Sequence, residues 1–170
     1  MPADSLWELA NIALVMIGLS GIVAILGRRM HGEWTTGDIK RLSLMLISGF
    51  RLIFAALLPL VFINFGMPDK SVWVVSSAIG FAASFGLLIY LWGPWIPTMP
   101  EDERSSPIID YWVRFLLLST IVIYLLNTLG VIFDQSFGPY FLACILTFAN
   151  AATFLFRLIF VELIQHNLTK

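Results

Sequence analysis

Two arginines lie inside apolar stretches of the sequence, where a charged side chain is costly. Arg51 and Arg157 are the second residues of two copies of the pentapeptide Phe-Arg-Leu-Ile-Phe, at 50–54 and 156–160. A guanidinium group carries a permanent positive charge and five N–H donors, so its chemistry is the binding of anionic groups. An arginine at the centre of a bilayer costs about 2.5–3.5 kcal/mol on insertion scales, so each arginine is expected to have a partner.

The two arginines differ in their expected depth. Arg51 lies ten residues after Arg41, which corresponds to about 15 Å along a helix and places it close to mid-bilayer. Arg157 lies seven residues before Ile164, about 10 Å from the boundary, where a long side chain can extend toward lipid phosphates. For Arg51 the sequence leaves three alternatives open: a salt bridge inside the bundle, carbonyl contacts near Pro59, and a water-filled cavity.

Other polar side chains are rare in the apolar stretches. Glu162 is the only acidic residue in the inner half of a predicted span, and it is expected to pair with a neighbour such as Arg51 or Arg114. Three asparagines are expected to form interhelical hydrogen bonds of about 0.6–2 kcal/mol each. The candidate residues for an ion pathway or an intramembrane polar network are Arg51, Arg157, Glu162, Asn127, Asn150 and Asn11.

The sequence offers no set of residues typical of catalysis. Neither His31 nor His166 lies at membrane depth, so a haem or metal site built on histidine within the membrane is not expected. Cys144 is the only cysteine, and it lies in an apolar stretch as a small hydrophobic residue. Glycine-rich phosphate loops and nucleophile-elbow motifs are absent from the sequence. We therefore predict no catalytic residues, no metal, no cofactor and no enzyme activity.

The composition is that of a membrane protein. Hydrophobic residues make up 59% of the 170 residues and charged residues 12%, against about 45–50% and 25% in soluble domains. A net charge of -1 without a basic run excludes nucleic acid as a partner. The two arginines must therefore be positioned by elements that cross a bilayer, and helices satisfy their own backbone polar groups there.

Five apolar stretches are long enough to cross a bilayer, which takes about 20 residues each. We predict an all-α integral membrane protein in which residues 1–170 form a single domain, a compact bundle of five transmembrane helices. Residues 93–111 contain four prolines and are expected to form an irregular connector on the cytoplasmic side. The helices are expected at about 6–26, 42–65, 72–92, 112–133 and 140–163.

Small residues predict where these helices approach one another. Gly18 and Gly21 form a small patch on the first helix, where another helix could pack closely. Ser76, Gly80 and Ser84 are spaced four residues apart on the third helix and therefore share a face. We expect the third helix to be the packing hub of the bundle.

Basic residues in the short connections predict the orientation of the chain. The first connection carries four of them, whereas the second and fourth connections together carry only Lys70. We therefore predict that the N-terminus lies outside and the C-terminus in the cytoplasm, with the first connection against anionic headgroups. The four basic residues of that connection are Arg28, Arg29, Lys40 and Arg41.

Three short motifs resemble small, uncharacterised inner-membrane proteins of bacteria. They are Val-Trp and Ser-Ser within 72–77, Phe-Gly-Pro-Tyr at 137–140 and Phe-Arg-Leu at 156–158. The resemblance covers most of the chain. It implies a location in a bacterial inner membrane and does not imply a particular activity.

Two functions are compatible with these features. In the first, copies of the chain associate into a homo-oligomeric ion channel or pore, in which Arg51 creates a bias toward anions. In the second, the chain is a non-catalytic accessory, scaffolding or lipid-sensing subunit of a larger membrane complex, whose arginines bind anionic headgroups. The surroundings of Arg51 distinguish them, because a channel requires this side chain to line a hydrated space.

Overall fold

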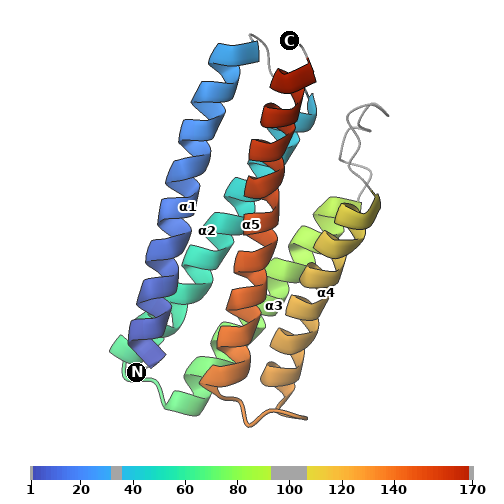
Figure 1. Ribbon diagram of the computed structural model, residues 1–170. Coiled ribbons are helices and arrows are strands. Elements are labelled where there is room, and N and C mark those ends of the chain that lie inside the picture. The colour runs from blue at the N-terminus through green and yellow to red at the C-terminus, as the bar shows by residue number, and fades with distance from the viewer. Residues whose placement is uncertain (1, 32–35, 93–106, 169–170) are drawn as a thin grey trace.

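The computed structural model describes residues 2–31, 36–92 and 107–168 (Figure 1). Each of the five helices in these residues contains a stretch of at least 21 residues that is long and apolar enough to cross a membrane. The prediction of an all-α bundle of five transmembrane helices is confirmed, and the protein is a polytopic integral membrane protein. The helices are α1 (Pro2–His31), α2 (Thr36–Asn64), α3 (Asp69–Trp92), α4 (Pro107–Leu129) and α5 (Phe137–Leu168).

Consecutive helices run in opposite directions, so the bundle has two ends. At the lower end in Figure 1, α1 begins, α2 is followed by α3, and α4 is followed by α5. At the upper end α1, α3 and α5 end, and α2 and α4 begin. In this view α1, α5 and α4 lie in front, and α2 and α3 lie behind them.

The helix α5 is the packing hub of the bundle. It contacts each of the other four helices and packs most extensively against α2 and α4. By contrast, α3 packs mainly against α4 and has a smaller contact with α2. The prediction that the third helix would be the hub is wrong, because only one face of α3 turns inward. Ser76 and Ser84 are buried on that face, whereas Ala82 and Gly86 beside it are exposed.

Two glycines mark close approaches between helices. A Cβ atom at Gly80 would lie 2.7 Å from the ring of Tyr124 in α4, so the ring occupies the space of a side chain. A Cβ atom at Gly49 would lie 2.7 Å from a side chain of α1. At Gly18 or Gly21 it would have nothing within 4 Å. Within the chain, Gly80 and Gly49 therefore lie in helix contacts, and the face of α1 with Gly18 and Gly21 stays open.

The helix α4 begins within the stretch that the sequence indicated as a connector. Pro107 is its first residue, because a proline in the first turn removes no helical hydrogen bond. The prediction of an irregular connector over 93–111 is therefore wrong for 107–111. The remaining part, 93–106, lies outside the described residues.

The turns at the lower end use glycines in left-handed conformations. The helix α4 ends at Leu129, before the expected position 133, because Gly130 follows it with a φ angle of +66°. Between α2 and α3, Gly66 has a φ angle of +74°. Both turns are short, so the helices that they join pack side by side in antiparallel directions.

The buried apolar residues form two clusters, one in each half of the bundle. Arg51 lies on α2 at the junction between them. The upper cluster includes Met45, Leu117 and Phe154, and the lower cluster includes Ala55, Trp73, Tyr124 and Tyr140.

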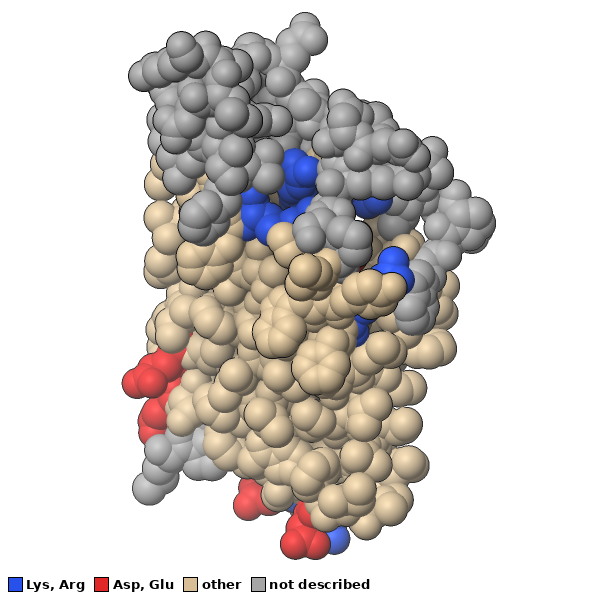
Figure 2. Space-filling model, turned by 45° about the vertical axis from the view of Figure 1, so that its right-hand side comes forward, with Lys and Arg blue, Asp and Glu red and all other residues tan. Residues whose placement is uncertain are grey.

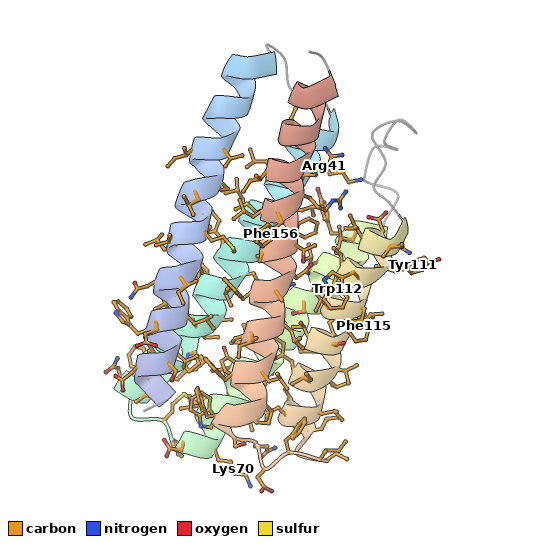
Figure 3. All side chains as sticks on the ribbon, viewed as in Figure 1. Arg41, Lys70, Tyr111, Trp112, Phe115 and Phe156 are labelled. Atoms are coloured by element: carbon orange, nitrogen blue, oxygen red, sulfur yellow. The ribbon has the colours of Figure 1, made fainter. Side chains whose placement is uncertain are left out.

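The outer surface fits a bilayer. On the face shown in Figure 2, most Lys and Arg lie in the upper half, and most Asp and Glu lie toward the lower end, where a basic side chain also appears. A broad part of the surface above the lower end is free of both kinds. Tyr111, Trp112 and Phe115 project outward from the upper half of α4 (Figure 3). Aromatic side chains of this kind are enriched where a membrane meets water.

Candidate functional site

Arg51 is at the centre of the apolar span of α2. It lies twelve residues after Ile39 and thirteen before Asn64, which are the ends of that span. At about 1.5 Å per residue, its Cα atom is about 18 Å from either end. Nε, Nη1 and Nη2 of Arg51 are all buried, and none has a hydrogen-bond partner within the described structure. A permanent cation therefore lies unpaired at mid-membrane.

The backbone of α5 carries Glu162, the acidic residue expected near Arg51, toward the upper end of the bundle. The helix α5 places Glu162 fifteen residues beyond Thr147, which lies beside Arg51, and this is about 22 Å along the helix axis. The side chain of Glu162 lies outside the described part of the chain, so its pairing with a neighbour such as Arg51 or Arg114 stays a prediction. Among the described residues, the titratable groups that interact electrostatically with Arg51 are Tyr124 and Cys144, and neither is ordinarily charged at neutral pH.

Arg51 lines a cavity of about 210 Å³ between α2, α3, α4 and α5. Its inner wall is formed by buried residues with polar side chains: Ser76, Ser84, Tyr124, Tyr140 and Thr147. Its rim is formed by exposed residues of α2 and α3: Phe54, Ile79 and Ala83. The surface of the cavity itself is mostly apolar, and the buried polar atoms of Arg51 and Ser76 lie just behind it. The cavity opens between α2 and α3, at the depth where lipid chains surround the bundle.

Most hydroxyl groups of the cavity wall already donate their hydrogen to the backbone. Ser84 donates to the carbonyl of Gly80 at 2.7 Å, and Thr147 donates to the carbonyl of Ala143 at 2.9 Å. The Oγ of Ser76 has no partner within the described structure. Among the described residues of the wall, Arg51 and Ser76 therefore have buried polar atoms without a hydrogen-bond partner, and these atoms lie close behind the cavity surface.

The two tyrosines of the wall are held in place by other contacts. The hydroxyl of Tyr140 donates to the carbonyl oxygen of Ala55 in α2. The hydroxyl of Tyr124 lies 3.4 Å from the Sγ of Cys144 in α5. The rings of Tyr124 and Tyr140 are 5.6 Å apart between centroids. Because these contacts link α2, α4 and α5, they fix the base of the cavity.

A groove of about 360 Å³ adjoins the cavity and shares Arg51 and Ala83 with it. It runs toward the upper end of the bundle, because Ile47 precedes Arg51 on α2, and Gly86 and Tyr90 follow Ala83 on α3. The groove is apolar apart from Arg51 and the hydroxyl of Tyr90. It occupies the surface where the contact between α2 and α3 is small.

Comparison of the chain with protein-family models, curated proteins and solved structures found no match. The geometry around Arg51 and the positions of the other candidate residues are therefore the features that indicate function.

Arg157, in the second copy of the pentapeptide, has an acidic partner. Its Nη1 lies 3.7 Å from Oδ1 of Asp110 in α4. The prediction that it extends to lipid phosphates is wrong, because α4 begins early enough to bring Asp110 alongside it. Phe156 points away from the bundle and is exposed, as are Phe50 and Phe54 of the first copy (Figure 3). The two copies thus share an outward phenylalanine, but Arg157 has an acidic partner, whereas the nitrogens of Arg51 have no hydrogen-bond partner within the described structure.

The basic residues predicted to meet headgroups lie at the upper end of the bundle. Arg41 is only 7% exposed, and Figure 3 shows it above the level of Phe156. The positive charge of Arg41 repels that of Arg157, and the negative charge of Asp110 attracts Lys40. The side chains of Arg28 and Arg29 lie outside the described residues.

Asn127 has a structural role. Its Nδ2 donates to Ser77 Oγ of α3 at 2.8 Å, and its Oδ1 accepts the backbone N–H of Ser136 at 3.2 Å. The first bond joins α4 to α3, as expected of an interhelical asparagine. The second holds the residue that precedes α5. Both functional groups of the amide are thus used in packing.

The remaining asparagines differ from Asn127. Asn150 is 1% exposed, and neither atom of its amide group has a partner within the described structure. It lies one turn beyond Thr147 on α5, and Ser48, which is likewise unpartnered, lies one turn before Arg51 on α2. Asn11 is exposed on α1. The six candidate residues therefore do not form one pathway, and those near the cavity are Arg51 and Asn150.

Two groups of cavity residues were among the sequence candidates: Arg51, and three residues of α3 chosen for packing, Ser76, Gly80 and Ser84. The other residues of the wall were not. Tyr140, Cys144 and Thr147 follow one another at spacings of four and three and so share a face of α5. This spacing is the signal that could have identified them. Among the described residues, no three His, Cys, Asp or Glu side chains come together as a metal ion would require.

Proposed function

We propose that this protein is a non-catalytic membrane protein that binds an anion within the bilayer through Arg51. One observation carries the proposal: all three side-chain nitrogens of Arg51 are buried and unpartnered beside a cavity of about 210 Å³. Ionisable residues inside a membrane normally have a partner and mark ligand or ion sites. An anion in the cavity would supply the missing charge and acceptors.

The position of the opening favours a lipid-sensing or accessory role. The rim residues Phe54 and Ile79 are 73% and 45% exposed on the lipid-facing surface of α2 and α3. A ligand would therefore enter sideways from the bilayer. On this proposal the protein reports the presence of its ligand to a larger membrane complex, and enzyme activity is not required.

A homo-oligomeric channel with anion bias is the second candidate. It is favoured by the opening of the Arg51 cavity at the surface of a single chain, since a neighbouring copy over this opening would create an intersubunit space lined by Arg51. The open face of α1 at Gly18 and Gly21 offers a place for helix packing between copies.

The orientation is part of the proposal. Basic residues at the upper end of the bundle support placing that end in the cytoplasm, with the N-terminus outside, in a bacterial inner membrane. Anionic headgroups would then meet the first connection between α1 and α2.

Two measurements on wild type and Arg51→Gln test these proposals. In nanodiscs, an anionic ligand should raise the melting temperature of wild type but not of Arg51→Gln. In liposomes, anion flux through wild type that is lost in Arg51→Gln would favour the channel. If no anion stabilises wild type in a way that depends on Arg51, and no flux depends on Arg51, both proposed functions are contradicted. The variant Lys70→Gln, which removes an exposed cation at the lower end, is the control.

A further inference from the structure

We infer that the ligand of this site is a single-chain carboxylic acid of the lipid phase, with its carboxylate on Arg51 and its chain in the groove between α2 and α3. This inference rests on the proposed binding function and names the class of ligand. It follows from the depth of Arg51, the number of charges in the cavity, the free donors, and the shape of the adjoining groove.

The depth of the site favours an acid that can travel uncharged. Arg51 lies about 18 Å from either end of the span of α2. A phosphodiester stays ionised at neutral pH and would have to carry its charge to this depth. A carboxylic acid can lose its charge by taking up a proton in a medium of low dielectric. It can therefore reach Arg51 as the neutral acid and ionise beside the guanidinium, releasing its proton to the aqueous phase.

The charge of the cavity fits a monoanion. Arg51 is the only residue with a charged side chain among the described residues of the cavity wall. A dianionic phosphate group would keep an uncompensated negative charge in a buried site, which is unfavourable. A single carboxylate neutralises the single guanidinium.

The donors also match a carboxylate. A guanidinium group presents parallel N–H donors whose spacing suits the two oxygens of a carboxylate, and such bidentate pairs are stronger than neutral hydrogen bonds. Ser76 Oγ, on the same cavity wall, offers a further free hydroxyl. The hydroxyls of Ser84, Thr147 and Tyr140 already donate to carbonyl groups of the chain.

The groove supplies a place for one apolar chain. The groove has a volume of about 360 Å³ and begins at Arg51. Its apolar walls are formed by Ile47, Ala83, Gly86 and Leu87. A Cβ atom built on Gly86 would have nothing within 4 Å, so the space above this residue is open. A chain attached to a carboxylate at Arg51 can lie in this groove with one side against the protein and the other toward lipid.

The experiment measures binding of palmitate labelled with ¹³C at its carboxyl carbon to the full chain in nanodiscs. We expect saturable binding to wild type and a shifted carboxyl resonance. Arg51→Gln should weaken binding by about tenfold or more, because two charge-assisted hydrogen bonds are lost. Arg51→Lys should bind more tightly than Arg51→Gln but less tightly than wild type. Lysine restores the positive charge but not the paired N–H donors of the guanidinium group. Lys70→Gln should bind as wild type does.

A second variant tests the groove separately from the charge. In Gly86→Leu the added Cβ atom has nothing within 4 Å, so the leucine can enter the groove and the fold should be retained. We expect this variant to lose affinity for palmitate while keeping a weaker affinity for octanoate, whose chain is shorter. Methyl palmitate, which has the chain without the charge, should not compete.

The outcomes separate this inference from the proposed function. If phosphatidylglycerol or chloride binds in a way that depends on Arg51 and palmitate does not bind, the assignment of the ligand as a carboxylic acid is overturned. The proposed anion site is then retained. Equal binding of palmitate to wild type and Gly86→Leu would also overturn the assignment of the groove. Absence of any anion binding that depends on Arg51 would overturn both the carboxylic acid and the proposed anion site.

Discussion

Tyr140 donates its hydroxyl hydrogen to the carbonyl oxygen of Ala55, 85 positions away in the sequence. This carbonyl is the one that Pro59 leaves without its helical donor, because proline lacks the N–H that would bond to the residue four positions earlier. A side chain of α5 therefore satisfies a backbone gap in the middle of α2. The bond also fixes one edge of the cavity beside Arg51.

The first prediction concerns this bond. Tyr140→Phe should destabilise the protein by about 1–3 kcal/mol, because it leaves a buried carbonyl unsatisfied. In a Pro59→Ala background the N–H of residue 59 is restored to the helix, so the same substitution should cost less. Thermal unfolding in detergent of wild type, both single variants and the double variant measures this coupling. Equal costs of Tyr140→Phe in both backgrounds would contradict the assignment.

The second prediction compares the two arginines of the repeated pentapeptide. Arg51→Met removes an unpaired charge from mid-membrane, so we expect it to stabilise the ligand-free protein by about 2–3 kcal/mol. Arg157→Met separates Asp110 from its partner at 3.7 Å and should destabilise the protein. Melting temperatures after removal of bound lipid distinguish the two. If both variants were destabilised to the same degree, Arg51 would have a partner within the chain.

The third prediction concerns the asparagine that joins α4 to α3. Asn127→Ala should destabilise the protein by about 1–2 kcal/mol, since it removes the bonds to Ser77 and Ser136. Asn11→Ala, on the exposed face of α1, is the matched control and should have little effect on a monomer. A double-mutant cycle with Ser77→Ala measures the interhelical bond directly. Additive effects of the two substitutions would show that the bond contributes nothing.

The presence of five spans could be predicted because hydrocarbon length and apolar composition determine it. Their ends could not, since α4 occupies Pro107–Leu129 and not 112–133. The depth of Arg51 followed from its place in one helix. Its surroundings did not, because the wall of the cavity comes from four helices. Which faces of α4 and α5 turn toward α2 depends on their rotation about their own axes, which no single span encodes. For the same reason Asp110 was missed: its pairing with Arg157 depends on α4 beginning at Pro107.

The packing hub was mispredicted for a related reason. A row of small residues on α3 indicated that another helix approaches α3 closely. It did not indicate how many helices pack against α3. The ring of Tyr124 fills the space at Gly80, while the space at Gly86 stays open. Small residues at helical spacing therefore identified a contact at one position and a groove at another. Only the positions of the neighbouring helices distinguish these two uses.

The last prediction uses this difference. Gly80→Ala would place its Cβ atom 2.7 Å from the Tyr124 ring, so the ring or the helix must shift. We expect a loss of about 1–3 kcal/mol, as in other overpacked cores, and a weaker response to anions, because Tyr124 lines the Arg51 cavity. Gly86→Ala makes the same chemical change on the same helix in open space. It should keep or slightly raise the melting temperature, since alanine favours helix more than glycine by about 1 kcal/mol. Circular dichroism of both variants on heating gives the comparison. A similar melting temperature for both variants would mean that the Tyr124 ring does not fill the space beside Gly80. The ring would then not form the wall of the cavity that positions the ligand.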